Sequence, residues 1–142
     1  MNRCASLILS SQLRELDRLL DWFQQLGSDI LPSNTIDQCQ LLLSEGFTNV
    51  VNHAHEDRPI ETQIEIQADI LIDSVEIRIW DQGNGFDLES KLTQLLESTP
   101  NTEAEGGRGL LIISKIADQL SYLPCDDQRN CLYMIKHYMN QT

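Results

Sequence analysis

Apolar residues recur every three or four positions between Pro32 and His55, which predicts a long amphipathic helix. Its apolar face carries Ile36, Cys39, Leu43, Phe47, Val50 and Ala54. Its polar face carries Gln38, Glu45, Asn49, Asn52 and Glu56, with His53 at the edge. Residues 48–52 are consecutive weak helix formers, each about 0.5 kcal/mol worse than alanine. Weak helix formers in the middle of a strongly amphipathic helix indicate a functional site. The alternative interpretation is that the polar face of this helix is only exposed to water.

The rest of the pattern predicts a second layer of strands and two further helices. The predicted elements are a strand at 4–9, helices at 11–26 and 110–120, and strands at 61–70, 75–80, 121–124 and 131–137. Ser10 or Ser11 would cap the first helix and Gly27 would end it. Alternation in the middle strands favours an antiparallel hairpin. This order predicts one α/β domain over residues 1–142, a two-layer sandwich in which helices cover one face of a mixed, mostly antiparallel sheet.

The connection between the two halves of the sheet is unusually long. Residues 87–105 are polar and contain only a weak helical segment at 88–96, followed by Pro100. Connections of this length in a compact domain are usually lids or disordered. We therefore expect a lid over about residues 87–106.

Composition narrows the class of protein. The chain has 142 residues and a net charge of −12, which argues against nucleic acid and anionic membrane surfaces as partners. The four cysteines show no C-x-x-C spacing, so we interpret them as reduced thiols of a cytoplasmic protein. No secretory signal and no apolar run of about 18 residues is visible, and we expect no membrane association.

Asp81-Gln-Gly-Asn-Gly stands where the second middle strand ends. A carboxylate there can accept hydrogen bonds from an exocyclic amine such as N6 of adenine, and Gly83 and Gly85 allow a flat ligand to approach the backbone. The alternative is a tight turn. The spacing does not match a dinucleotide fingerprint, and the chain contains no P-loop motif.

Gly106-Gly107-Arg108-Gly109 precedes the helix predicted at 110–120. Glycines that lead into a helix N-terminus expose backbone N–H groups to a phosphate, and the helix dipole favours the negative charge. Arg108 and Lys91 are the two cations between Gln82 and Ser114. A flexible hinge is the alternative interpretation of this motif.

Glu45 and Asn49 lie one helical turn apart on the polar face. An amide oxygen is a hard ligand suited to Mg²⁺, which takes few protein oxygens and keeps waters and phosphates. Glu45 could accept a proton from an attacking hydroxyl or water. His53, a further turn along, could donate to a phosphate.

Together, in this order, these motifs resemble those of the superfamily of gyrase, histidine-kinase and mismatch-repair ATPases, which has the Bergerat-type ATP-binding fold. The residues on which this resemblance rests are Ser44-Glu45-x-x-Thr48-Asn49-x-x-x-His53-Ala54, Asp81-x-Gly83-x-Gly85 and Gly107-Arg108-Gly109-Leu110. The first of these, in a domain of this length, is similar to the bacterial anti-sigma-factor serine/threonine kinases.

That resemblance implies a function and a set of roles. Such kinases bind ATP and Mg²⁺, phosphorylate a small anti-anti-sigma (STAS-type) protein, and sequester a sigma factor as homodimers. It implies that Glu45 is the general base, Asn49 the Mg²⁺ ligand and Asp81 the adenine reader. The phosphates would be lined by His53, Arg108, Leu110 and the glycines Gly83, Gly85, Gly107 and Gly109.

Two other functions stay open. One is a switch module that binds nucleotide and a partner without phosphotransfer, although the presence of Glu45 favours an enzyme. The other is the catalytic domain of a sensor histidine kinase, against which the first helix contains no histidine. The sequence also departs from the family pattern at Gly46, Asn52 and Asn130, where alanine, a basic residue and glycine are usual.

Overall fold

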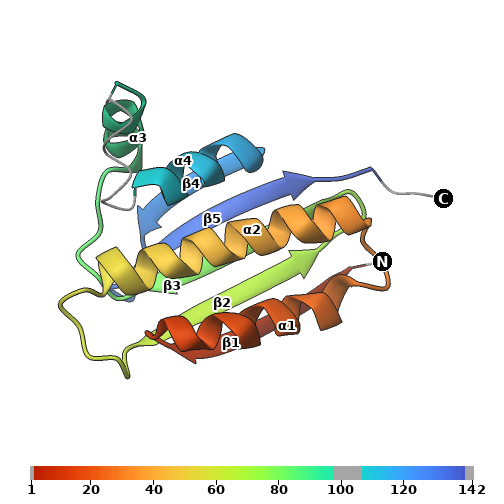
Figure 1. The fold of residues 1–142 in the computed structure, drawn as a ribbon, viewed down its shortest axis with the longest axis horizontal. Helices are drawn as coiled ribbons and strands as arrows, with labels where there is room; N and C mark the ends of the chain where they lie inside the picture. Colours follow the sequence, from red (N-terminus) through yellow and green to blue (C-terminus); the bar gives the residue numbers. More distant parts are fainter. Residues whose placement is uncertain (1, 98–106, 140–142) are drawn as a thin grey trace.

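The computed structural model describes residues 2–97 and 107–139. The strands are β1 (Arg3–Ser10), β2 (Gln63–Ile70), β3 (Ser74–Asp81), β4 (Gln119–Pro124) and β5 (Asn130–His137). The helices are α1 (Leu16–Gly27), α2 (Ser33–Asn49), α3 (Leu88–Glu97) and α4 (Gly107–Ile116), with a 3₁₀ turn η1 (Leu13–Glu15) and a π-helical turn η2 (Val50–Ala54). The sheet order is β1-β2-β3-β5-β4, and α1, α2 and α4 cover one face (Figure 1). The predicted two-layer α/β sandwich is confirmed.

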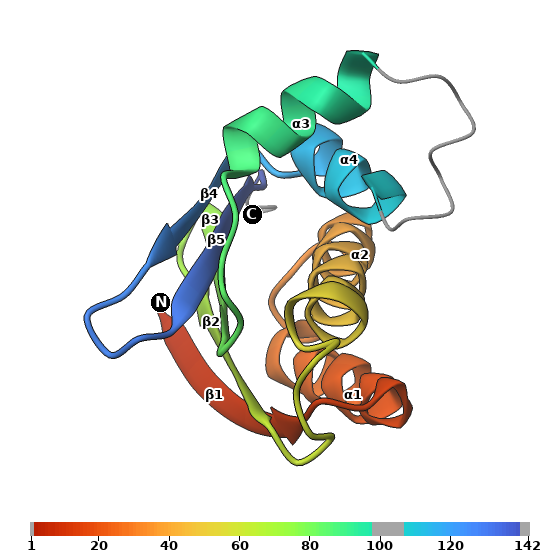
Figure 2. The same cartoon turned by 90° about the vertical axis from the view of Figure 1, so that its left-hand side faces the viewer.

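All four pairings in this sheet are antiparallel, whereas the sequence predicts a mixed, mostly antiparallel sheet. The helices α1, α2 and α4 pack on the same side of the sheet, and the side view separates the two layers (Figure 2). β3 is central, and its register pairs Asp81 with Asn130 of β5. This pairing brings the end of the middle hairpin next to the start of the last strand.

The predicted apolar face of α2 lies against the sheet. Cys39, Leu43 and Phe47 are completely buried, as are Ile77 and Ile79 of β3. The helix packs closely on the sheet at Gly46, where an added Cβ would lie 2.7 Å from Ile79 Cδ1. This close approach gives a packing reason for glycine at a position where alanine is usual.

Two sequence expectations about helix ends are wrong. Neither serine caps the first helix, because Ser11 Oγ instead contacts the buried His55 and the Ser10 N–H and hydroxyl donate to Glu15 Oε2. The last helix stops at Ile116 rather than Leu120. Beyond it the Asp118 N–H donates to Ile135 O, and Gln119 and Leu120 belong to β4 rather than to the helix.

α2 does not run regularly to its end, because its last turn is the π-helical η2. The His55 N–H donates to Val50 O at 2.8 Å, an i to i+5 bond that widens the helix by one residue per turn. Such turns occur preferentially at functional sites. The weak helix formers of residues 48–52 are therefore where the geometry changes.

The expected lid, residues 87–106, lies only partly within the described chain. Its predicted helical segment is present as α3, which packs beside α4 (Figure 2). Residues 98–106, with Pro100 and Gly106, are outside the described residues. None of the helices within 2–97 and 107–139 combines the length and the apolar character that crossing a bilayer requires.

Candidate functional site

A cleft runs between α2 and α4 and continues toward the loop after β3. It consists of two cavities of about 310 and 270 Å³ that share Asn49 and His53 in their walls. The first is lined by Glu45, Thr48, Asn49, Asn52, His53, Arg108, Gly109 and Ile112. The second is lined by Asn49, His53, Ala54, Glu56, Asp57, Arg58, Asn84, Gly85, Phe86, Lys91, Leu110 and Tyr122. The shared walls make the two cavities a single elongated site.

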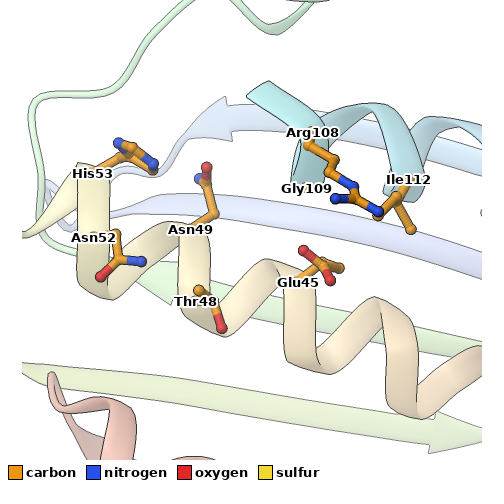
Figure 3. A pocket seen from close by; sticks show the side chains of 8 residues that line it. All are labelled: Glu45, Thr48, Asn49, Asn52, His53, Arg108, Gly109 and Ile112. Carbon is orange, nitrogen blue, oxygen red and sulfur yellow. The ribbon is translucent and has the colours of Figure 1, made fainter. Parts of the chain in front are cut away.

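Glu45 lies against the first turn of α4. An added Cβ at Gly109 would lie 2.8 Å from Glu45 Oε1, so any larger residue there would displace the carboxylate from its position. Figure 3 shows Glu45, Asn49 and His53 at successive turns of the helix side that faces Arg108 and Gly109. The N-terminus of α4 is the place where its dipole favours negative charge. The cleft thus brings a carboxylate to a position that also suits a phosphate.

The polar side chains at this end of the cleft are not used by the fold. Within residues 2–97 and 107–139, neither Glu45, Asn49 nor His53 makes a side-chain hydrogen bond or an ion pair, and the same holds for Arg108. Three of the ten Lys and Arg residues, Arg58, Lys91 and Arg108, stand in the cleft wall of a protein with net charge −12. Unpaired donors and oxygens in a concave wall are available to a charged ligand.

The Mg²⁺ expectation is compatible with the donors present. Asn49 and Glu45 offer an amide and a carboxylate oxygen one turn apart in the wall of the same cavity. As far as the chain is described, no three His, Cys, Asp or Glu side chains converge into a metal cage. Mg²⁺ normally takes only one or two protein oxygens together with waters and phosphates, and these two residues could supply that set.

Asp81, at the end of β3, is only 2% exposed, and both of its carboxylate oxygens accept hydrogen bonds. Its Oδ1 accepts hydrogen bonds from the Gly83 N–H at 2.8 Å and from Asn130 Nδ2 at 3.1 Å. Its Oδ2 accepts a bond of 2.7 Å from the Tyr122 hydroxyl. Burial, and then this bond to Asp81, raise the pKa of Tyr122 far above its ordinary value, so the phenol stays protonated.

A second buried network ties the glycine loop to α2 and β1. His55 is 3% exposed, and its Nε2 accepts a 2.8 Å bond from the Gln82 N–H. Because Nε2 accepts, Nδ1 carries the proton and donates to Ser11 Oγ at 3.0 Å. Burial is the main cause that lowers the pKa of His55, which keeps the ring neutral.

The structure brings most of the predicted site residues together. Glu45, Asn49, His53, Gly85, Arg108, Gly109 and Leu110 all line the cleft. Asp81, Gly83 and Gly107 stand behind its wall instead. Gly83 packs on the Ala54 carbonyl, where an added Cβ would lie 2.5 Å from the oxygen, and Gly107 packs on Leu95 of α3.

Sequence reasoning missed the residues that support Asp81. Tyr122 and Asn130 come from the last hairpin, and no motif marks them. His55 adjoins a recognised motif but not one of its fixed positions. The signal that could have found Asn130 was the pairing of β5 with β3. Because β3 ends at Asp81, a polar residue at the start of β5 lies opposite that carboxylate. Phe86 and Arg58 belong to loops beside the motifs, where neither helical nor strand periodicity predicts the direction of a side chain.

A nucleotide-type cleft between a helix and a glycine-rich helix start, on a five-stranded antiparallel sheet, defines a class of ATP-binding domain. The family model described as the histidine kinase-like ATPase domain matches residues 9–136. The chain belongs to this family.

Proteins similar to the chain include several named serine-protein kinase RsbW. That of Oceanobacillus iheyensis is 31% identical over 109 residues, 74% of this chain and 66% of its own length. That of Staphylococcus aureus (strain MRSA252) is 31% identical over 90 residues, which cover 61% of this chain and 57% of the relative. That of Bacillus licheniformis is 29% identical over 89 residues, 60% and 55%. The matched regions thus span between about half and two thirds of these relatives, and the resemblance drawn from the motifs is confirmed.

Proposed function

We propose that the chain is an ATP-dependent serine/threonine protein kinase that acts as an anti-sigma factor or a related partner-switching regulator. The observation that carries the proposal is the position of Glu45, whose carboxylate lies on Gly109 at the start of α4, one turn from Asn49. A proton acceptor, a metal-suited amide and a phosphate-suited helix N-terminus then meet in one cleft. The serine-protein kinases named above support the choice of substrate residue.

In this proposal each residue of the first cavity has one task. Glu45 accepts the proton of the attacking serine hydroxyl, since no described residue competes for its oxygens. Arg108 and the N–H groups of the first turn of α4 bind the terminal phosphate, with His53 as a further donor. Asn49 would hold Mg²⁺, which when bound neutralises charge on the phosphates. Residues 87–106 close over the nucleotide as a lid.

The second cavity receives the base. Asp81 accepts from the exocyclic amine of adenine, and Gly83 and Gly85 bring the backbone close to the ring. Leu110 and Phe86 provide apolar surface in its wall. Discrimination for adenine then comes from one buried acceptor rather than from the shape of the cavity.

The partners follow from the same family. The substrate is a STAS-type anti-anti-sigma protein, a sigma factor is the second partner, and the kinase is a homodimer. β1 supplies a sheet edge that a second copy could extend, because within residues 2–97 and 107–139 it pairs only with β2. Light scattering at the monomer mass across micromolar concentrations would contradict the homodimer.

The test of the kinase is phosphate transfer from labelled ATP to a STAS-type protein encoded in the same genome, with Mg²⁺ and without it. We expect phosphoserine or phosphothreonine on the partner, formed only with Mg²⁺. Calorimetry on the same protein should show adenine nucleotide binding. No nucleotide binding at millimolar concentration would contradict the proposal at its first step.

A second function, a nucleotide-dependent switch without phosphotransfer, is favoured by one observation. No described residue orients Glu45 by a hydrogen bond, whereas a general base is commonly held by a further group. A wild-type chain that binds ADP and a partner tightly, but transfers no phosphate to any tested partner, would establish this function instead.

A further inference from the structure

The carboxylate expected to read adenine already accepts three hydrogen bonds from the fold. A carboxylate offers about four lone-pair sites, and Asp81 accepts from Gly83, Asn130 and Tyr122. Gly83 and Asn130 both bond to Oδ1, whereas Oδ2 has the Tyr122 hydroxyl as its one partner among the described residues. The two oxygens therefore differ: one is held by the hairpin loops, and the other by a single side chain.

Tyr122 stands between this carboxylate and the cleft. Its ring stacks on Phe86 with centroids 4.5 Å apart and an angle of 26° between the planes. Both rings line the cavity of about 270 Å³, whereas Asp81 appears in the wall of neither cavity of the cleft as far as the residues are described. A flat base that enters from the cleft meets the Tyr122–Phe86 stack before it reaches Asp81.

The tyrosine offers Asp81 the same chemistry as adenine would. It has a flat aromatic ring with one hydrogen-bond donor in the ring plane, at a distance of 2.7 Å that is normal for O–H···O. The half-buried hydroxyl stays a donor because its pKa is raised. Phe86 then stacks against this ring as it could against a purine.

We propose that Tyr122 is an internal occupant of the base site, and that adenine binds by exchanging its amino N–H for the tyrosine O–H on Asp81 Oδ2. This inference rests on the proposed nucleotide binding at Asp81. The bonds from Gly83 and Asn130 to Oδ1 persist in both states, so only one side chain has to move. The fraction of molecules in which Tyr122 has left the carboxylate then sets the apparent affinity for adenine nucleotides.

Tyr122→Phe tests the exchange because it keeps the ring and the stack on Phe86 but removes the competing donor. We expect calorimetry to show ADP binding about tenfold tighter than in the wild type, since a hydrogen bond to a charged group is at stake. Tyr133→Phe is the matched control. Tyr133 lies on β5 with its ring under the Arg78 guanidinium, and it lines neither cavity of the cleft within the described chain, so its removal should leave ADP affinity unchanged.

A second measurement does not depend on the variant. The nuclear Overhauser effects between the Phe86 ring and the Tyr122 ring, whose resonances are assigned by their loss in Tyr122→Phe, should disappear on saturation with ADP, because the exchange moves Tyr122 away from both Asp81 and Phe86. A tyrosine that only supports Asp81 would keep this contact with Phe86. A Tyr122–Phe86 contact that persists in the ADP-saturated protein would overturn the exchange.

The outcomes also separate this inference from the proposed function. ADP binding that is equal or weaker in Tyr122→Phe than in the wild type would overturn the exchange alone and leave the ATP site in place. ADP binding that appears only in the variant would support the exchange in its strongest form. No ADP binding by either folded protein would overturn both.

Discussion

Asp81 and Glu45 are carboxylates beside the same cleft, but their surroundings are opposite. Asp81 is 2% exposed and accepts three hydrogen bonds from other parts of the fold. Glu45 is half-buried and, within the described residues, accepts none. A buried charge without partners would be costly, so the first carboxylate must be satisfied before any ligand arrives. The second can stay free because water reaches it.

This difference separates stability from chemistry. Groups that the fold satisfies contribute to its free energy of unfolding, and a ligand must exchange with their partners. Groups that the fold leaves free contribute little to stability and are available for a reaction. The base end and the phosphate end of the cleft should therefore respond to substitution in different ways.

The largest expected effect is at the free carboxylate. Glu45→Gln keeps the size of the side chain but removes the proton acceptor, so transfer of phosphate to the partner should fall by about 10²- to 10⁴-fold. ADP affinity and the urea midpoint should hardly change. Glu61→Gln, at an exposed carboxylate outside the cleft wall, is the control. Unchanged transfer in Glu45→Gln would remove this residue as the base.

Asp81→Asn should affect stability as well as binding. The amide keeps one acceptor oxygen but presents N–H groups to donors, so we expect a loss of about 1.5–3 kcal/mol in the free energy of unfolding. Nucleotide affinity should fall with it. Urea denaturation and calorimetry measure both, with Asp37→Asn on the exposed side of α2 as the control. A variant as stable as the wild type would contradict the role of Asp81 in the fold.

Asn49→Ala should show the reverse pattern at the phosphate end. Because the fold makes no described hydrogen bond to this amide, the free energy of unfolding should change by less than about 0.5 kcal/mol. The increase in ADP affinity on adding Mg²⁺ should be lost. Asn34→Ala, at the start of the same helix, should keep both properties. A Mg²⁺ effect of wild-type size in Asn49→Ala would exclude this ligand.

The smallest effect is a pH dependence from His55. Its pKa is lowered mainly by burial and further by Arg58, against an opposing effect of Asp81. As pH falls from about 7 to about 5, an unfolded histidine with a pKa near 6.5 takes up a proton that the folded ring resists. The free energy of unfolding should therefore decline in this range, by at most about 1.4 kcal/mol per pH unit. His55→Gln should remove this decline and His53→Gln, at an exposed ring, should retain it.

Much of this architecture could be predicted because its signals are periodic or local. The α2 face, the middle hairpin and the end of α1 at Gly27 follow from hydrophobic spacing and one glycine. The residues around Glu45 and Asn49 follow because a helix places positions four apart on one side. Tyr122 and Asn130 could not be found in this way, since only the packing of the last hairpin brings them to Asp81.

Helix ends were the least predictable part. Serine is a common N-cap residue, but the hydroxyl of Ser11 is instead hydrogen-bonded to a buried imidazole 44 residues away. Leu120 continues the apolar pattern of the helix, but the Asp118 N–H, two residues earlier, donates a hydrogen bond to Ile135 O in the sheet. In both cases a long-range partner outweighs a local preference, and such a partner is invisible to a window of a few residues.

The π-helical turn at Val50–Ala54 has a consequence for insertions and deletions in this segment. Upstream of it Glu45 contacts Gly109, and downstream of it the Ala54 carbonyl contacts Gly83. The π-helical turn can absorb the loss of one residue by returning to regular α-helical bonding, whereas deletion of one residue from the regular helix between Glu45 and the turn would rotate one contact relative to the other by about 100°. The phosphate end and the base end would then no longer face the same cleft. The length of this regular helix is thus as constrained as the identity of its side chains.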